Sequence, residues 1–333
     1  MEDLKTHASV REMTREMSLP DPMDREGKPR RVGVEIELGG LSEQAVAEIV
    51  RAHLGGEIER RAAHVLLVRQ TRLGDLQIYL DTAYKEPGNA ALEQALELGR
   101  GLIPVEIVTE PVEIAALEPL DALVDRLRED GAKGTEDQLF NGYGVHFNVS
   151  AVSLSAGDIV PVVRAFALLE DWLRAALPID ITRRLLPFVS PYPRAFVDAV
   201  AREGADWTLE DLTRHYLEKT PTRNRALDLL PLLREADEAQ VVEALGKDAE
   251  SVNARPAFHY RLPDSRIGEP DWSLLREWRR WCLVEQVASR PELLTHLSEA
   301  WIDYRDALTT LPGDWIRTVD EALSRAFGTE APA

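Results

Sequence analysis

Two glutamates, Glu35 and Glu37, stand two residues apart in a segment whose alternate positions are apolar. The segment reads Arg31-Val32-Gly33-Val34-Glu35-Ile36-Glu37-Leu38-Gly39-Gly40, and its period of two is that of a β-strand. The two carboxylates therefore lie on one face, about 7 Å apart at ~3.3 Å per residue. A solvated outer face and an acidic site explain this pair equally well. The β-branched residues and the Gly-Gly that follows favour a buried strand whose polar face lines a cavity.

Four later segments also combine an apolar face with a face of side chains that can bind metals or phosphate. Singly, each such residue has an ordinary explanation, since a strand carboxylate is commonly exposed and a strand histidine is commonly a hydrogen-bonded core residue. If the strands share one sheet, their polar faces converge. The residues are Asp81 in the strand expected at 76–81, Glu106 in 104–109, His146 and Asn148 in 143–150, and His259 and Arg261 in 256–262.

A group of carboxylates in a semi-enclosed site repels itself and loses hydration unless a cation compensates. Oxygen ligands with one or two imidazoles suit Mg²⁺ or Mn²⁺ better than Zn²⁺. Two such ions could hold the phosphates of a nucleotide, with Arg261 supplying a fixed guanidinium. The spacing alone leaves a metal site and a set of unrelated polar residues equally open.

The composition is that of a globular chain and excludes several classes of partner. The 333 residues are 44% apolar and 29% charged, and 58 acidic against 39 basic side chains give a net charge of −19. Such a field repels nucleic acid and anionic membranes. A single cysteine, Cys282, excludes an internal disulfide and a cysteine-based zinc cluster, and its setting indicates a helix packing position. Without an apolar leader or a long apolar segment, we expect a cytoplasmic protein.

The order of elements indicates the fold class. Strands are expected mainly before residue 150, together with helices at 42–54, 89–100 and 119–129, and the chain from 158 to 245 is mainly helical. The strand at 256–262 is followed by helices within 272–326. This pattern favours an α+β fold with one mixed or antiparallel sheet over a doubly wound fold.

The motif residues resemble those of the amidoligase family, distant relatives of glutamine synthetase and glutamate–cysteine ligase. The matches keep the family's order and span residues 31 to about 270. Gly33-Val34-Glu35-Ile36-Glu37 resembles its Gly-x-Glu-x-Glu strand, Glu106-Ile107-Val108-Thr109-Glu110-Pro111 its Glu-Leu-Val-Ser-Pro strand, Gly144-Val145-His146-Phe147-Asn148-Val149-Ser150 its Gly-x-His-Val-His-x-Ser strand, Arg225-Ala226-Leu227-Asp228-Leu229 its Arg-x-Leu-Asn-Leu segment, and Phe258-His259-Tyr260-Arg261-Leu262 its Phe-Glu-Phe-Arg-Leu strand.

The resemblance implies a largely antiparallel sheet of the glutamine synthetase-like type, curved to form a concave ATP–metal site and flanked by helices, with a helix-rich C-terminal half. It also implies ATP-dependent joining of a small-molecule or peptide carboxylate to an amine through an acyl-phosphate. We expect residues 1–30 to be a mobile arm. Residues 31–333 would then be one amidoligase-like catalytic domain with a helical insertion at about 155–250 and C-terminal helices at 272–326.

By the same resemblance, the site residues divide into two metal sets and a nucleotide set. Glu35, His146 and His259 would hold one ion, and Glu37, Asp81 and Glu106 would hold the other. Asn148 and Ser150 would lie near the nucleotide, Arg261 near the transferred phosphoryl group, and Arg225 is a further candidate there.

Two departures from the family pattern matter for the expected metal and nucleotide residues. Asn148 stands where the family has a second histidine, and His259 stands where it has a glutamate. Asn148 cannot become cationic, and His259 can ligate a metal but removes one negative charge from the site. These departures keep open a non-catalytic protein that binds a metal or nucleotide and a partner. A metal-dependent hydrolase is a third hypothesis, although the sequence shows no activated nucleophile for it.

Overall fold

The computed structural model describes residues 14–80, 103–135, 142–176 and 189–328. Its centre is β1 (Arg31–Leu38), the strand that carries Glu35 and Glu37. β1 lies between β5 (Val105–Thr109) and β7 (Val145–Ser150) in a nine-stranded sheet whose paired strands are all antiparallel. The order β2-β3-β4-β5-β1-β7-β9-β8 leaves β2 and β8 at the two edges, so the sheet is not closed. The expected α+β class with an antiparallel sheet is confirmed.

The remaining strands are short, and three of them, β3, β4 and β9, lie where the alternation of the sequence placed them. Three were not anticipated: the edge strand β2, which is rich in charged residues, and the two-residue strands β6 and β8. The expected helix at 89–100 and the residue Asp81 lie outside the described residues. The bounds are β2 (Glu57–Ala62), β3 (Val65–Thr71), β4 (Gly74–Leu80), β6 (Val112–Glu113), which pairs with β1, β8 (Leu227–Asp228) and β9 (Ala257–Tyr260).

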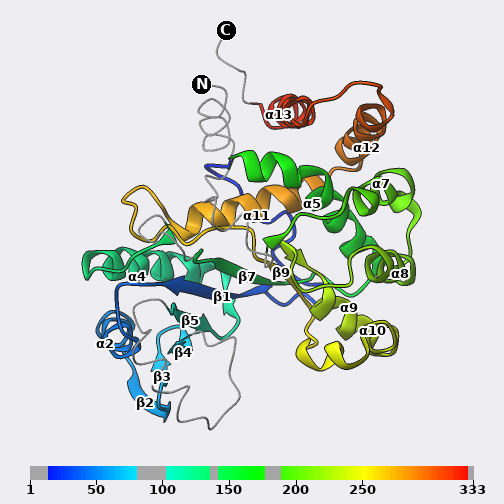
Figure 1. Cartoon of the computed structure of the whole chain (residues 1–333). Helices are drawn as coiled ribbons and strands as arrows, with labels where there is room; N and C mark the ends of the chain where they lie inside the picture. The colour runs from blue at the N-terminus through cyan, green and yellow to red at the C-terminus, as the bar shows by residue number, and fades with distance from the viewer. Residues whose placement is uncertain (1–13, 81–102, 136–141, 177–188, 329–333) are drawn as a thin grey trace.

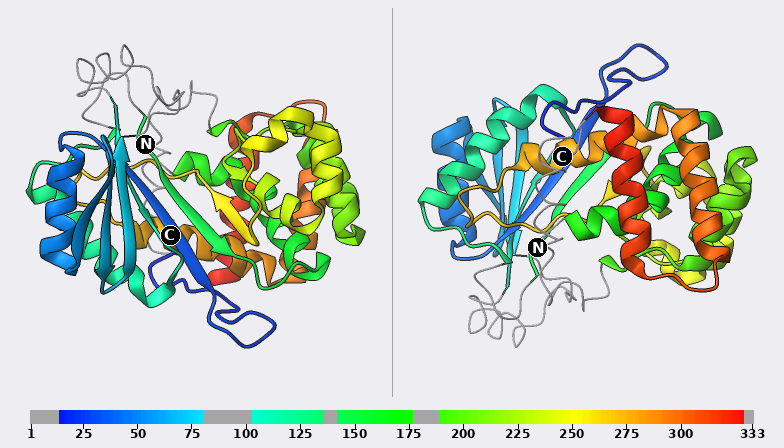
Figure 2. Two further views of the ribbon diagram at one scale, coloured as in Figure 1. Left: turned by 90° about the horizontal axis from the view of Figure 1, so that it is seen from below. Right: turned by 90° about the horizontal axis from the view of Figure 1, so that it is seen from above.

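The apolar face of the sheet is buried beneath α4 (Leu117–Glu129), α5 (Ala156–Ala176) and α11 (Leu274–Ala288), which lie on one side of β1 and β7 (Figure 1). Aromatic contacts join α11 to this face. Trp278 lies 5.7 Å from Phe147, and Trp281 lies 5.4 Å from Phe258, between ring centroids. The alternation that predicted the strands therefore separates a core face from a face turned away from α11, which Figure 2 shows from below.

Two glycines shape the chain that leads from β1 through α2 to β2: Gly40 before the helix and Gly55 after it. Ser42 caps α2 (Glu43–Leu54) by accepting from the Ala45 N–H, and Gly55 ends the helix with a φ of 79°, as the sequence predicted. Before this helix, Gly40 has a φ of 82°, and a Cβ there would lie 2.5 Å from the Gly131 carbonyl oxygen. Glycine is therefore required where β1 leaves the sheet.

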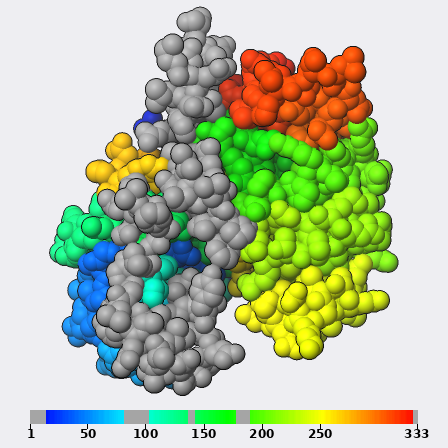
Figure 3. Space-filling view, in the orientation of Figure 1, coloured from blue at the N-terminus to red at the C-terminus, as the bar shows by residue number. Residues whose placement is uncertain are grey.

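Helices dominate the C-terminal part, as expected. Their packing includes the thiol-bearing side chain of Cys282, which is buried on α11 as predicted. Figure 3 shows α7 to α10 and then α12 and α13 along one side of the molecule. No helix within the described residues is long and apolar enough to span a bilayer. The bounds are α7 (Arg194–Glu203), α8 (Leu209–Lys219), α9 (Leu230–Ala236), α10 (Glu238–Leu245), α12 (Pro291–Asp306) and α13 (Pro312–Phe327).

The described part of the N-terminal segment, residues 14–30, contacts the helical layer. The Arg30 guanidinium donates to both carboxylate oxygens of Glu285 on α11, at 2.7 and 2.8 Å, and both side chains are buried. Gln286 donates to the Ser18 carbonyl oxygen. The bidentate pair connects the residue just before β1 to the helix that covers the sheet.

Candidate metal centre

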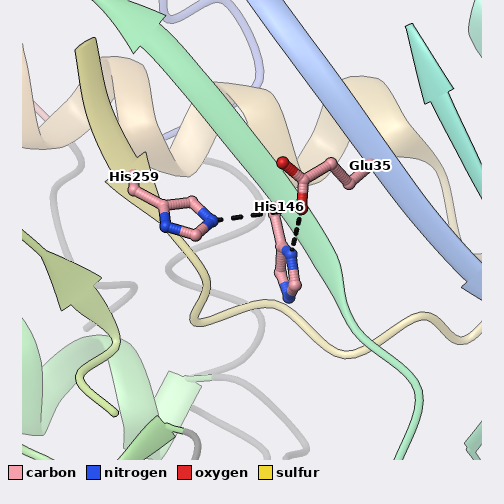
Figure 4. A group of neighbouring side chains, drawn as sticks. All are labelled: Glu35, His146 and His259. Atoms are coloured by element: carbon pink, nitrogen blue, oxygen red, sulfur yellow. Dashed lines mark hydrogen bonds and ion pairs between the residues drawn. The ribbon is translucent and has the colours of Figure 1, made fainter. Parts of the chain in front are cut away.

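Glu35 and His146 lie side by side because β1 and β7 pair in a register that places Glu35 opposite His146. Directly opposite residues in an antiparallel pair project from the same face of the sheet. The His146 Nδ1 atom lies 2.7 Å from Glu35 Oε2 (Figure 4). Register and parity thus bring together the first two residues of one metal set expected from the sequence.

His259 joins this pair from β9, on the other side of β7. Its Nε2 atom lies 4.0 Å from Glu35 Oε2, and its ring meets that of His146 edge-on at a centroid distance of 5.5 Å. One ligand atom from each of the three residues lies within 4.8 Å of the others. His259 is 4% exposed, and among the described residues neither of its ring nitrogens has a hydrogen-bond partner.

The electrostatics of the group favour an ionised Glu35 beside a neutral His259. Burial by itself would raise the pKa of Glu35, but the hydrogen bonds from His146 and Asn148 and the nearby histidine charges outweigh it, so this pKa lies below its ordinary value. Burial lowers the pKa of His259 to about 4, against the opposing effects of Asp228 and Glu35. At neutral pH His259 therefore keeps a lone pair for a metal.

The three side chains fit a divalent cation. Ligand atoms held at roughly 2.0–2.4 Å from one ion lie about 2.7–4.8 Å from one another, and the separations here fall in that range. A buried histidine without a hydrogen-bond partner is rare in a purely structural role. A cation would supply that partner and offset the Glu35 charge. This group is a candidate metal centre.

The two residues expected near a nucleotide are held by β1. Asn148 Nδ2 donates to Glu35 Oε1 at 2.7 Å, so the asparagine orients the carboxylate whose other oxygen contacts His146. The Ser150 hydroxyl accepts from the Arg31 N–H and donates to the Arg31 carbonyl oxygen. Asn148 therefore contacts the candidate metal group, Ser150 takes part in the pairing of β1 with β7, and the role of both near a nucleotide stays a prediction.

The second metal set is only partly placed. Glu37 lies opposite Glu106 in the register of β1 with β5, so the two side chains share the face of Glu35. Glu106 is buried, and Glu37 Oε2 accepts from the Gly144 N–H at 2.7 Å. Asp81 lies outside the described residues, so a second ion here stays a prediction.

The two arginines expected in catalysis occupy different surroundings. Arg261 follows β9, and its guanidinium donates to the Arg223 carbonyl oxygen at 2.8 Å. Arg225 donates to the Thr220 hydroxyl and, at 2.7 Å, to the Pro191 carbonyl oxygen. These contacts attach Arg225 to the segments that precede α7 and follow α8, and its role at the phosphoryl group stays a prediction.

Sequence reasoning missed two residues near the centre. Asp228 on β8 is fully buried opposite His259, with Oδ2 3.4 Å from His259 Nδ1. Arg255 lies close enough to Glu35 and Asp228 to interact with both charges. Asp228 stood within the segment at 225–229 where the family pattern has asparagine, and that substitution was the available signal. Arg255 precedes β9 without any pattern that marks it.

Comparison with known families agrees with this site. A family model described as "Putative amidoligase enzyme" matches residues 28–283. The match includes every strand of the sheet and every residue of the candidate metal centre. No curated protein and no solved structure matches the chain.

Proposed function

The chain belongs to the family of putative amidoligase enzymes, and from this we propose that it is an ATP-dependent carboxylate–amine ligase. The substrates are a small-molecule or peptide carboxylate and an amine, with ATP and Mg²⁺ or Mn²⁺ as cofactors. We further propose that the sheet curves around the ATP–metal site in the manner of glutamine synthetase. The observation that carries the proposal is the convergence of Glu35, His146 and His259 on the polar face of a family-matched sheet.

The reaction has two displacements. A carboxylate oxygen of the acid attacks the γ-phosphorus of ATP, the bond from that phosphorus to the bridging oxygen breaks, and ADP leaves with an acyl-phosphate remaining. The amine nitrogen then attacks the acyl carbon, phosphate leaves with the bonding electrons, and the nitrogen loses a proton. A bound divalent cation offsets the phosphate charge as it meets the anionic acid.

The chain's own residues support this chemistry in separate ways. Glu35, with its pKa held below the ordinary value, stays a carboxylate throughout the neutral range. Asn148 fixes its orientation. We assign Arg261 to the transferred phosphoryl group, because a fixed guanidinium stabilises negative charge that develops there.

The composition supports the remaining parts of the proposal. The net charge of −19 disfavours nucleic acid and anionic membrane as partners. Cys282 is buried on α11 and burial raises the pKa of its thiol, as for a cysteine that packs as an apolar side chain. We propose a cytoplasmic protein.

The test is trapping of the acyl-phosphate with hydroxylamine. The protein is incubated with ATP, Mg²⁺ or Mn²⁺ and panels of amino acids, dicarboxylates and peptides, and hydroxamate and ADP are measured together. Carboxylate-dependent formation of both, lost in Glu35→Gln, supports the ligase. Metal-dependent ATP binding without ADP or hydroxamate from any acid would favour the non-catalytic alternative, which the departures at Asn148 and His259 keep open.

A further inference from the structure

We propose that the Glu35–His146–His259 centre selects a divalent first-row transition ion, in the class from Mn²⁺ to Zn²⁺, over Mg²⁺, and that Asp228 orients His259 for that ion. The proposal rests on the proposed function only in treating the three side chains as one metal centre. Its first support is the donor set. Mg²⁺ favours oxygen ligands in octahedral geometry, whereas imidazole nitrogen suits the transition ions.

The low negative charge around the centre also disfavours Mg²⁺. Glu35 is its single carboxylate, and one of its oxygens already accepts from Asn148. The guanidinium of Arg255 interacts electrostatically with Glu35 and further reduces the negative potential there. A hard, strongly hydrated ion needs high negative charge to give up its water. Two imidazoles and one carboxylate hold softer ions by covalency as well as by charge.

Asp228 has the position of a residue that orients a ligand. It is fully buried, and the register of β8 with β9 places it opposite His259. Its Oδ1 atom accepts from the Leu230 N–H at 3.0 Å, which fixes the carboxylate, and its Oδ2 atom lies 3.4 Å from His259 Nδ1. A carboxylate on that side favours the proton at Nδ1, so the lone pair of Nε2 is directed toward Glu35.

A purely structural role for the Asp228–His259 pair does not account for the surroundings of His259 Nε2. A buried histidine that serves only the core normally has hydrogen bonds at both ring nitrogens. Here Nε2 is buried without such a bond and lies 4.0 Å from the glutamate oxygen that also contacts His146. The side of the ring opposite Asp228 therefore faces the other two ligands, as a metal ligand would.

The first experiment measures ion selectivity without nucleotide or substrate. The full-length protein is stripped of metal and titrated calorimetrically with Mg²⁺, Mn²⁺, Co²⁺ and Zn²⁺. Pulsed electron paramagnetic resonance of the Mn²⁺ form then counts coupled imidazole nitrogens. We expect tighter binding of the three transition ions than of Mg²⁺, with nitrogen coupling from two imidazoles. Equal or tighter binding of Mg²⁺, or Mn²⁺ bound without nitrogen coupling, would overturn the proposal.

The variant His259→Glu separates this centre from general metal affinity. It replaces one imidazole by a carboxylate, so the preference for Mn²⁺ over Mg²⁺ should fall by about tenfold or more, with the coupling of one nitrogen lost. The matched control is His64→Gln, since His64 is another buried histidine whose Nδ1 lies 3.1 Å from a carboxylate, that of Glu43. A change of selectivity in the control equal to that in His259→Glu would contradict the assignment.

The role of Asp228 is tested by a double-mutant cycle. Asp228→Asn keeps the shape and the acceptor for Leu230 but removes the charge that holds the Nδ1 proton. Affinity for Co²⁺ and Zn²⁺ should fall by about 10- to 100-fold. In the His259→Glu background the same change should cost little, because no imidazole remains to be oriented. An equal loss in both backgrounds would show that Asp228 acts only on the fold.

These titrations fail or succeed independently of the ligase assay. Selective binding of transition ions without hydroxamate formation would retain the proposed centre and refute the ligase. Hydroxamate formation with Mg²⁺ bound as tightly as Mn²⁺ would retain the ligase and refute the proposed selectivity.

Discussion

Replacing His259 by glutamine should make the metal-free protein less sensitive to acid. Burial lowers the pKa of His259 in the folded protein to about 4, whereas an unfolded chain gives histidine its ordinary value near 6.5. Below pH ~6.5 the unfolded chain binds a proton that the folded protein excludes, so the free energy of unfolding falls as the pH drops toward 4. This contribution to the free energy of unfolding is fully present above about pH 6.5, and it is lost as the pH falls from about 6.5 to about 4.

The size of the effect follows from the two pKa values. Between about pH 7 and pH 4.5 the parent should lose about 2.5 kcal/mol of stability through this residue alone. Glutamine does not titrate, so the His259→Gln variant does not lose this stability as the pH falls. Glu35 stays ionised in the folded protein across this range, because its pKa lies below the ordinary value.

The assay is urea unfolding of both proteins in chelator at the two pH values. Groups remote from the centre titrate alike in parent and variant, so the difference between the two unfolding free energies reports residue 259 and the charges that it contacts. That difference should move by about 2.5 kcal/mol in favour of the variant at the lower pH. If the difference were the same at both pH values, His259 would titrate normally in the folded protein and its burial would be wrong.

Three further substitutions test an ion pair, a glycine turn and a carboxylate around the centre. Arg30→Met leaves Glu285 buried and uncompensated and should cost about 3–5 kcal/mol in urea unfolding; a cost below ~1 kcal/mol would show that the pair is solvated. Gly40→Ala forces a Cβ against the Gly131 carbonyl at a φ of 82° and should lower stability by about 1–3 kcal/mol, whereas an unchanged melting temperature would contradict this backbone. Glu37→Ala should abolish the rise in melting temperature caused by Mg²⁺ and ATP without unfolding the chain, and a rise equal to the parent's would exclude Glu37 from the site.

The strands that carry chemistry could be predicted because burial on one face imposes strict alternation. β1 and β7 each show it, and both lie within a residue or two of their expected bounds. β2 was missed because an edge strand exposed to solvent needs no apolar face, and its sequence Glu-Ile-Glu-Arg-Arg-Ala has only one large apolar residue. β8 was missed because two residues are too few to show a period.

At the site, the sequence predicts which face of a strand each residue occupies, but it does not predict which strands lie side by side. Parity placed Glu35, His146 and His259 on polar faces, but only the pairing of β1 with β7 and β7 with β9 makes them neighbours. Asp228 could not be assigned from the sequence, since its function depends on β8 lying beside β9. The expected preference for Mg²⁺ or Mn²⁺ over Zn²⁺ was argued from the residues of both metal sets together. The described group contains one carboxylate and two imidazoles, and the selectivity proposed above follows from that difference.

The position of β1 in the middle of the sheet has a consequence for biosynthesis. β1 precedes the other strands of the described sheet in the chain, its neighbour β7 follows more than a hundred residues later, and β9 follows later still. Until then, the edge of β1 that pairs with β7 stays open, and an unpaired strand edge favours aggregation. His259 arrives only with β9, so a nascent chain cannot assemble the candidate metal centre until residues 257–260 have been translated. Pairing between strands this far apart in the sequence is intrinsically slow, because loop-closure entropy is lost before the strand contacts form.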